Sequence, residues 1–264
     1  MAVSVGLAGP HRGIITLFGI LCNVISGAVF LAPMPTFWRV FKNKSTQGFQ
    51  AVPYLVSLFS CTLLLYYSFL KTEDAKLIIT INTIGFIIEA FYLTVFIIYA
   101  PTNVKVRTIK LLGLLNFGVL GLIVIATMGF VRGTDTRVVF SKGGVREQTV
   151  GWICTAVSIT VFASPLTVMK TVIKTRSVEF MPFFLSFSLT ICAVLWFIYG
   201  LLIQDFFIAM PNVLGFLLGI GQMVLYAIYK KLSPKNQQKT VEAEDGGIER
   251  VYEIDIHDDI TAGD

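Results

Sequence analysis

The chain has 264 residues, of which 55% are hydrophobic and only 14% charged, and its mean hydropathy is +0.76. This composition excludes an ordinary soluble domain and indicates a protein whose main solvent is lipid. The formal net charge of +5 does not indicate a nucleic-acid partner, because the surplus belongs to loops between apolar segments.

Seven stretches are long and apolar enough to cross a bilayer, which takes about 20 residues. They are apolar on all sides, whereas the helices of a soluble protein would alternate apolar and charged faces. The sequence therefore predicts an all-α membrane protein with seven transmembrane helices. The predicted spans lie near residues 14–37, 52–70, 77–99, 111–130, 149–171, 181–203 and 207–229.

The positive residues are distributed unequally between the two sides of the membrane. Fourteen of the 21 Lys and Arg residues lie in the C-terminal tail or in and beside the loops that follow the first, third and fifth spans. The other seven lie on the opposite side of the membrane. The positive-inside rule then puts residues 1–13 outside the cell and the C-terminus in the cytoplasm. Residues 230–264 have a net charge of −4 and few large apolar side chains, so we expect a disordered cytoplasmic tail.

The chain contains an internal duplication. The segment VFLAP, at residues 29–33, is answered by VFASP at residues 161–165. Each copy is followed by a basic loop and then by a helix that begins at a proline, Pro53 in the first copy and Pro182 in the second. Later in each copy, NTIGF beginning at Asn82 matches NVLGF beginning at Asn212.

This duplication predicts two structural repeats with a site between them. The repeats are residues 14–99 and 149–229, and residues 100–148 hold a linker helix with its flanking loops. A single intervening span lets both triplets enter the membrane with the same polarity. We therefore predict two parallel three-helix bundles joined by a linker helix, a 3+1+3 arrangement.

The residue types needed for catalysis or metal binding do not come together in the sequence. His11 and His257 lie outside the spans on opposite sides, and no Gly-rich phosphate loop is present. The four cysteines fall within apolar spans, where inert buried thiols are the usual finding. We predict no enzyme, no metal site and no cofactor.

The polar residues inside the spans are the candidate site. Asn82 and Asn212 each lie five residues into a span that runs inward, roughly 7–8 Å below its outer start. An amide offers both donors and an acceptor, which suits a neutral hydroxylated ligand. The indole of Trp196, expected at a similar depth, suits stacking against the C–H faces of a sugar ring. The alternatives are helix–helix hydrogen bonding for the amides and packing or interface anchoring for the indole.

Four prolines form a second constellation near the inner face. Pro33 and Pro165 lie late in inward-running spans, and Pro53 and Pro182 begin outward-running ones. Because proline removes a backbone hydrogen bond and permits a kink, they predict a hinge for the cytoplasmic mouth. The alternative, ordinary helix-end proline, suits Pro53 and Pro182 better.

At these motifs the chain resembles the SWEET family of eukaryotic sugar transporters, over residues 14 to about 230. The phrases APMPTF, TRSVEFMPF and PNVLG carry the likeness, especially to plant members. The resemblance implies gradient-driven, bidirectional carriage of mono- or disaccharides by alternating access, without ion coupling. It implies an outer gate of Tyr67, Lys71 and Asp205, and an inner hinge at the four prolines. The implied sugar pocket comprises Ser26, Val29, Ser60, Leu64, Asn82, Ser158, Val161, Cys192, Trp196 and Asn212.

The chain departs from the family pattern at two pocket positions. Leu64 occupies the place that matches Trp196 in the other repeat, where similar members carry a second tryptophan. Cys192 replaces a serine. The small residues of the implied pocket resemble those of sucrose-carrying plant members, so the expected substrate is sucrose, with hexoses as the close alternative. These small residues are Ser26, Val29, Ser158 and Val161.

Glu89 is the single acidic residue deep inside a span, and such a group is functional by default. It leaves open a proton-coupled small-molecule transporter of similar architecture. A seven-helix receptor is a third reading, although receptors lack the three-span duplication. We expect an integral protein of the plasma membrane, with the vacuolar membrane as the alternative, and a homo-oligomer is compatible with the sequence.

Overall fold

The structure is a computed structural model that describes residues 10–71, 75–129, 144–161, 163–178, 181 and 183–230. Over these ranges every regular element is helical, and seven helical stretches are long and apolar enough to cross a membrane. The predicted fold class is therefore confirmed. Pro182, His257 and the acidic part of the tail lie outside the described residues.

The first repeat consists of α1 (Pro10–Leu31), α2 (Met34–Asn43), α3 (Val52–Leu70) and α4 (Lys76–Tyr99). The first span is not one continuous helix, because α1 ends just before Pro33 and α2 begins just after it. Proline cannot donate the backbone hydrogen bond that would continue α1. Helix α4 packs against both α1 and α3, so the third span lies between the first and the second.

The linker span is longer than the sequence predicted. It runs through α5 (Thr102–Gly113), a π-helical stretch η1 (Leu114–Val119) and α6 (Leu120–Gly129). The prediction began this span at residue 111 and put Lys105, Arg107 and Lys110 in a loop, which is wrong. The basic residues lower the average hydropathy, so the start of the helix resembles a loop in the sequence. Lys and Arg can nevertheless lie in a helix near the membrane surface, because their long side chains extend the charged ends to water.

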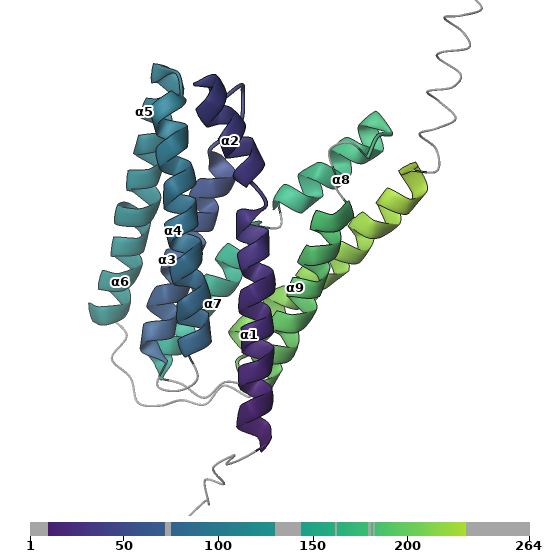
Figure 1. Cartoon of the computed structure of the whole chain (residues 1–264). Coiled ribbons are helices and arrows are strands. Elements are labelled where there is room, and N and C mark those ends of the chain that lie inside the picture. The colour runs from purple at the N-terminus through teal and green to yellow at the C-terminus, as the bar shows by residue number, and fades with distance from the viewer. Residues whose placement is uncertain are drawn as a thin grey trace, which may run out of the picture.

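The second repeat consists of α7 (Val145–Val161), α8 (Ala163–Thr175), α9 (Phe183–Leu202) and a last helix, Phe206–Lys230, which carries no label in Figure 1. Its first span comprises α7 and α8, and Pro165 is the third residue of α8. The short turn predicted before the last helix is present, with Gln204 in the left-handed region at a φ of 57°.

The two repeats make equivalent contacts. Helix α1 packs against α9 and α3 packs against α7, so the first span of each repeat contacts the second span of the other. Within each repeat, a side chain of the first span also donates a hydrogen bond to a backbone carbonyl of the third span. The Asn23 amide donates to the Leu77 carbonyl over 3.0 Å, and the Thr155 hydroxyl donates to the Phe207 carbonyl over 3.5 Å. These pairs keep the sequence spacing of the duplicated motifs, which supports a pseudo-twofold relation between the repeats.

The buried core is distributed unequally along the bundle. One cluster takes residues from both repeats, among them Phe59 and Tyr67 from α3 and Tyr199 from α9. A second cluster, which includes Phe37 and Tyr92, is built from the first repeat, with residues of the linker packed on it. The repeats are therefore joined by a shared core towards one end of the bundle.

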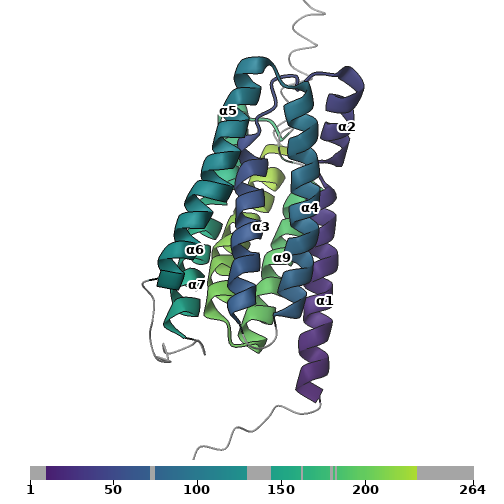
Figure 2. The ribbon, with the colours of Figure 1, turned by 90° about the vertical axis from the view of Figure 1, so that its left-hand side faces the viewer.

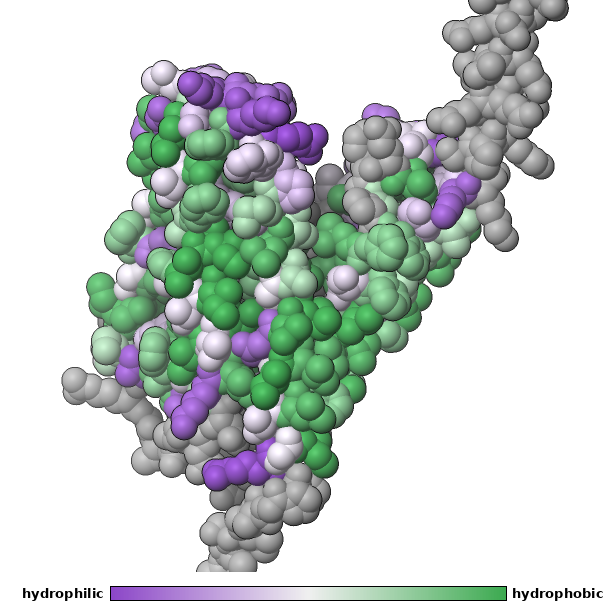
Figure 3. All heavy atoms as spheres, viewed as in Figure 1, coloured by the Kyte–Doolittle hydropathy of each residue, from purple (hydrophilic) through white to green (hydrophobic). Residues whose placement is uncertain are grey.

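The two ends of the molecule differ accordingly. Figure 1 shows the helices close together at the end where the chain passes from α3 to α4, which we call the closed end. At the other end, which we call the open end, α2 diverges from α8. The space-filling view is notched between the surfaces of α2 and α8 (Figure 3). The start of α1 and the end of the last helix lie at opposite ends, as seven crossings require (Figure 1). Figure 2 shows the linker helix along one edge and α1 along the other.

Candidate functional site

The closed end is held by one buried carboxylate. Asp205, whose side chain is fully buried, forms an ion pair with Lys71 and accepts a hydrogen bond from the Tyr67 hydroxyl over 2.9 Å, both through Oδ2. Its other oxygen, Oδ1, accepts the backbone N–H groups of Phe207 and Ile208 over 3.0 and 3.2 Å. A buried charge is tolerated when it is paired and its oxygens are hydrogen-bonded, and both conditions hold here.

These contacts join the repeats, because Tyr67 and Lys71 belong to the first and Asp205 to the second. The structure thus brings together all three residues expected at the outer gate. We call them the clasp.

A second tie at the closed end was missed by the sequence analysis. Arg146 at the start of α7 donates to the Tyr66 hydroxyl through Nη2, over 2.7 Å, and Nε, over 3.2 Å. The same hydroxyl lies 2.8 Å from Thr127 Oγ1 on α6. The linker helix is therefore bonded to α3 beside the inter-repeat contact of α3 with α7. None of the three residues belongs to a duplicated motif, so the sequence offered no signal for this tie.

Three of the predicted pocket residues meet across the seam between repeats. The indole Nε1 of Trp196 on α9 donates to Ser26 Oγ on α1 over 2.9 Å. Ser26 Oγ also lies 3.2 Å from Cys192 Sγ. The indole N–H points in the plane of the ring, so this bond orients Trp196 without covering its faces. Its ring packs at a right angle to Tyr199, with centroids 5.5 Å apart.

The two asparagines have the same geometry in the two repeats. Each donates Nδ2 to the carbonyl four residues earlier, Asn82 to Ile78 over 2.8 Å and Asn212 to Ile208 over 2.7 Å. This bond fixes each side chain and uses one of its two N–H donors. Among the described residues no hydrogen bond joins the two amides, and their convergence on one ligand stays a prediction.

The other predicted pocket residues are distributed over α1, α3 and α7. Leu64 packs against the same core cluster as Trp196. Val29, Ser60 and Ser158 are half-buried, and Val161 is exposed at the end of α7. Their roles in binding stay predictions.

The described prolines of the predicted hinge lie at helix ends. Pro33 separates α1 from α2, Pro53 lies in the first turn of α3 and Pro165 in the first turn of α8. Figure 1 shows these helix ends on the side of the bundle where α2 and α8 diverge. A hinge at these prolines would act at the open end.

Glu89 has its hydrogen-bond partner inside the first repeat. Only 4% of it is exposed, and its Oε1 accepts the Ser57 hydroxyl over 2.8 Å, from α3 to α4. Oε2 has no hydrogen-bond partner among the described residues. At the matching position of the second repeat, Gly219 packs closely against Thr190. Glu89 is therefore an asymmetric feature of the first repeat.

Comparison with known proteins identifies the family. The family model described as "Sugar efflux transporter for intercellular exchange" matches residues 16–104 and again residues 148–233. The two matches overlap the predicted repeats, residues 14–99 and 149–229. The chain belongs to this family, the SWEET transporters.

The relatives of this SWEET chain are named as transporters, not as enzymes. "Bidirectional sugar transporter SWEET9" of Arabidopsis thaliana is 53% identical over 214 residues, which cover 81% of this chain and 79% of the relative. "Bidirectional sugar transporter SWEET15" of Oryza sativa subsp. indica is 48% identical over 232 residues, covering 88% and 69%. A solved eukaryotic SWEET transporter at 3.7 Å resolution matches with a TM-score of 0.74 and 37% identity, over 84% of this chain and 99% of that one.

Proposed function

We propose that this SWEET protein is a bidirectional sugar uniporter that works by alternating access. The observation that carries the proposal is the difference between the two ends of the seam. At the closed end Asp205 binds Tyr67 and Lys71 of the other repeat, whereas at the open end α2 and α8 diverge. A seam closed at one end and open at the other corresponds to one of the two states that alternating access requires.

The chemistry of the seam suits a neutral polyol. Ser26 and Trp196 meet there, and Asn82 and Asn212 each keep an amide oxygen and one N–H beyond their intrahelical bond. Sugar hydroxyls both donate and accept hydrogen bonds, so they match amide groups, and the apolar face of a sugar ring matches an indole. We infer that the sugar lies between Trp196 and the two asparagines.

The transport cycle follows from the contacts that each state can make. Opening the closed end separates Asp205 from Tyr67 and Lys71, and water then hydrates the three polar groups. Closing the open end brings α2 towards α8, with bending beside Pro33 and Pro165. A bound sugar shifts the equilibrium between the two states only if it binds them with different affinity. The cycle is coupled to no other energy source, so the sugar gradient sets the direction of transport.

Ion coupling is the alternative mechanism, and the location of Glu89 argues against it. Its carboxylate binds Ser57 within one three-helix bundle, so a proton on it would not be exposed alternately across the seam. We propose uniport without proton coupling.

We further propose sucrose as the preferred sugar. Leu64, which packs on the same core cluster as Trp196, replaces a second aromatic wall and leaves more room for a disaccharide. By the positive-inside rule the closed end faces outward, with the N-terminus outside and the C-terminus in the cytoplasm. The plasma membrane is the proposed location.

Tracer counterflow in proteoliposomes tests these proposals together. Vesicles loaded with unlabelled sucrose, glucose or fructose receive a trace of the same labelled sugar, with and without an imposed pH gradient. We expect transient accumulation of the tracer, strongest for sucrose and unaffected by the pH gradient. Sugar that accumulates above equilibrium under a pH gradient would establish coupling, and absence of counterflow for every sugar would refute transport.

A further inference from the structure

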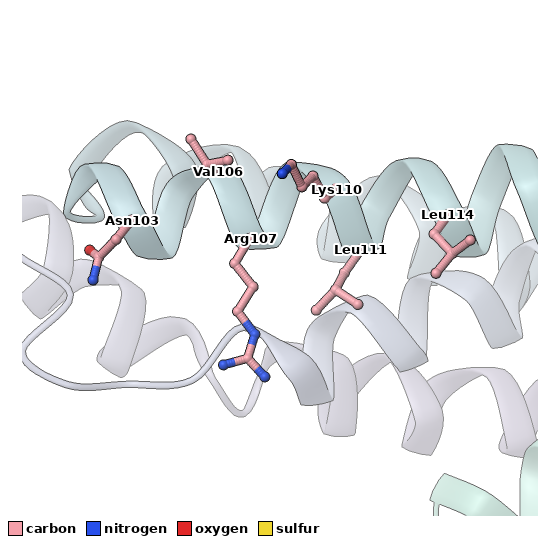
Figure 4. A pocket seen from close by; sticks show the side chains of 6 residues that line it. All are labelled: Asn103, Val106, Arg107, Lys110, Leu111 and Leu114. Carbon is pink, nitrogen blue, oxygen red and sulfur yellow. The ribbon is translucent and has the colours of Figure 1, made fainter.

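A groove runs along the linker helix, away from the seam between the repeats. All its lining residues belong to α5 and the first residue of η1, and they recur every three or four positions, so they share one face of the helix. The face is roughly 17 Å long at 1.5 Å per residue. The lining residues are Asn103, Val106, Arg107, Lys110, Leu111 and Leu114 (Figure 4).

The polarity of the groove changes along its length. Asn103 and Arg107 lie in the first two turns of α5, with Val106 beside Arg107, whereas Lys110 lies in the last turn. Leu111 and Leu114 follow Lys110. Figure 4 shows Asn103 and Arg107 extending to the same side of the helix. Arg107, Lys110 and Leu114 are exposed. The groove therefore has its polar and basic side chains between Asn103 and Lys110, with Val106 among them, and its largest apolar side chains at Leu111 and Leu114. It is open along its outer side.

The scaffold beneath the groove is fixed. Leu112 of α5, with Leu111, packs against the buried cluster of the first repeat that includes Phe37 and Tyr92. The start of α5 lies at the open end of the bundle, the same end as α2 (Figure 1). The polar part of the groove thus begins at the end of the candidate span Thr102–Gly129, where we expect the lipid headgroups.

The positive charges of the groove are not neutralised within the part of the chain that the structure describes. Over that part, the ion pair found is the one between Lys71 and Asp205, and no hydrogen bond of Arg107 or Lys110 is present. Two uncompensated cations one turn apart attract an anion, and an arginine suits phosphate oxygens in particular. At this level of a membrane the abundant anions are lipid headgroups.

We propose that this groove binds an anionic phospholipid from the leaflet at the open end. The lipid phosphate lies between Arg107 and Lys110, the headgroup reaches Asn103, and one acyl chain lies along Leu111 and Leu114. The apolar half of the groove favours a lipid over a free phosphate, which would leave it unfilled. It also disfavours the acidic tail of this chain, which has few large apolar residues to offer.

A lipid titration of the purified full-length protein tests this proposal. The protein, in an uncharged detergent, receives phosphatidylserine, phosphatidylcholine or the chain-free headgroup glycerophosphoserine, while thermal unfolding and native mass spectrometry report binding. The variant Arg107→Gln/Lys110→Gln removes both cations of the groove. The matched control Lys170→Gln/Lys174→Gln removes two exposed cations from α8, outside the groove.

We expect phosphatidylserine alone to raise the unfolding midpoint, because a ligand that binds the folded state stabilises it. Its affinity should fall roughly 30-fold in the groove variant and stay unchanged in the α8 control. Equal shifts from phosphatidylcholine or glycerophosphoserine would overturn the proposal, as would an equal loss in both variants or no shift at all. If phosphatidylserine does not shift the unfolding midpoint, and the groove variant is less stable than the wild type without lipid, the acidic tail would be favoured as the occupant.

Discussion

Tyr67 donates a hydrogen bond to Asp205 Oδ2 over 2.9 Å, across 138 positions of sequence and from one repeat to the other. Lys71 pairs with the same oxygen, whereas Oδ1 accepts two backbone N–H groups at the start of the last helix. The two oxygens of one carboxylate thus do different things. Oδ1 caps a helix within the second repeat, and Oδ2 holds the repeats together. The clasp can therefore open while the cap stays in place.

The clasp variants should open the closed end to different degrees. Asp205→Asn keeps an oxygen for the helix cap but leaves Lys71 without its partner, a change that costs about 3–5 kcal/mol for a buried pair. Tyr67→Phe removes one hydrogen bond to a charged group, about 1.5–3 kcal/mol. Cys154, buried in the core shared by both repeats, reports opening through its rate of maleimide labelling, mapped by mass spectrometry. We expect labelling to rise in the order wild type, Tyr67→Phe, Asp205→Asn, and equal rates in all three would contradict a gating role.

Each amide of the proposed sugar site should be needed for transport. Asn82→Ala or Asn212→Ala leaves sugar hydroxyls without a partner, at about 1–3 kcal/mol each, which corresponds to a roughly 5- to 150-fold rise in the half-saturating sugar concentration. The measurement is counterflow at several sugar concentrations. Asn116→Ala is the matched control, because its amide also donates to the carbonyl four residues earlier but lies on the linker helix. Normal transport by both pocket variants would remove these residues from the site.

The size of the pocket should depend on position 64. Leu64→Trp adds an aromatic ring at the position that matches Trp196 in the other repeat, and should reduce the room for a second sugar ring. We expect counterflow of sucrose to fall at least severalfold relative to that of glucose, measured side by side in the same vesicles. An equal fall in the counterflow of both sugars would point to a packing defect. Unchanged counterflow of both sugars would show that Leu64 does not set sugar preference.

Two glycines at matching positions should differ in their tolerance of a side chain. A Cβ on Gly151 would lie 2.4, 2.6 and 2.8 Å from three ring atoms of Phe207. A Cβ on Gly19 would lie 2.2 Å from the end of the flexible Leu77 side chain and 2.9 Å from one ring atom of Tyr199. Gly151→Ala should therefore lower unfolding stability by about 1–3 kcal/mol, and Gly19→Ala by less. Gly13, which has open space around it, is the control, and alanine there should be neutral or stabilising by up to about 1 kcal/mol. Thermal unfolding of the three variants decides the order.

Glu89 should matter for stability and not for coupling. Glu89→Gln keeps an oxygen for the Ser57 hydroxyl, so counterflow should continue at a similar rate and remain insensitive to a pH gradient. Glu89→Ala leaves Ser57 without its acceptor and opens a cavity, and should lower unfolding stability by about 2 kcal/mol or more. A pH-driven accumulation that is present in the wild type and lost in Glu89→Gln would reverse this interpretation.

Much of the architecture was predictable because it depends on local chemistry. Each span announces itself by its own length of apolar residues, and the doubling of VFLAP and NTIGF marks the two repeats. The helix ends were harder to predict. The prediction began the linker helix nine residues late, because the basic residues at its start resemble a loop in any hydropathy average. Nor did the sequence show that α1 stops before Pro33 and that a second helix resumes after it, since a proline can kink a helix or end it.

The residues alone determined that this chain is a membrane-embedded pair of three-helix repeats with two amides at matching places, because hydropathy and duplication belong to segments that can be read one at a time. The packing of the helices decided how those segments combine. It put α4 between α1 and α3 and joined α1 to α9, which is why Ser26 meets Trp196. It also closed one end of the seam through Asp205 and left α2 and α8 apart. The contacts of Ser26 and of Asp205 between the repeats link residues more than 130 positions apart. They depend on the relative placement of whole helices, which no local pattern encodes.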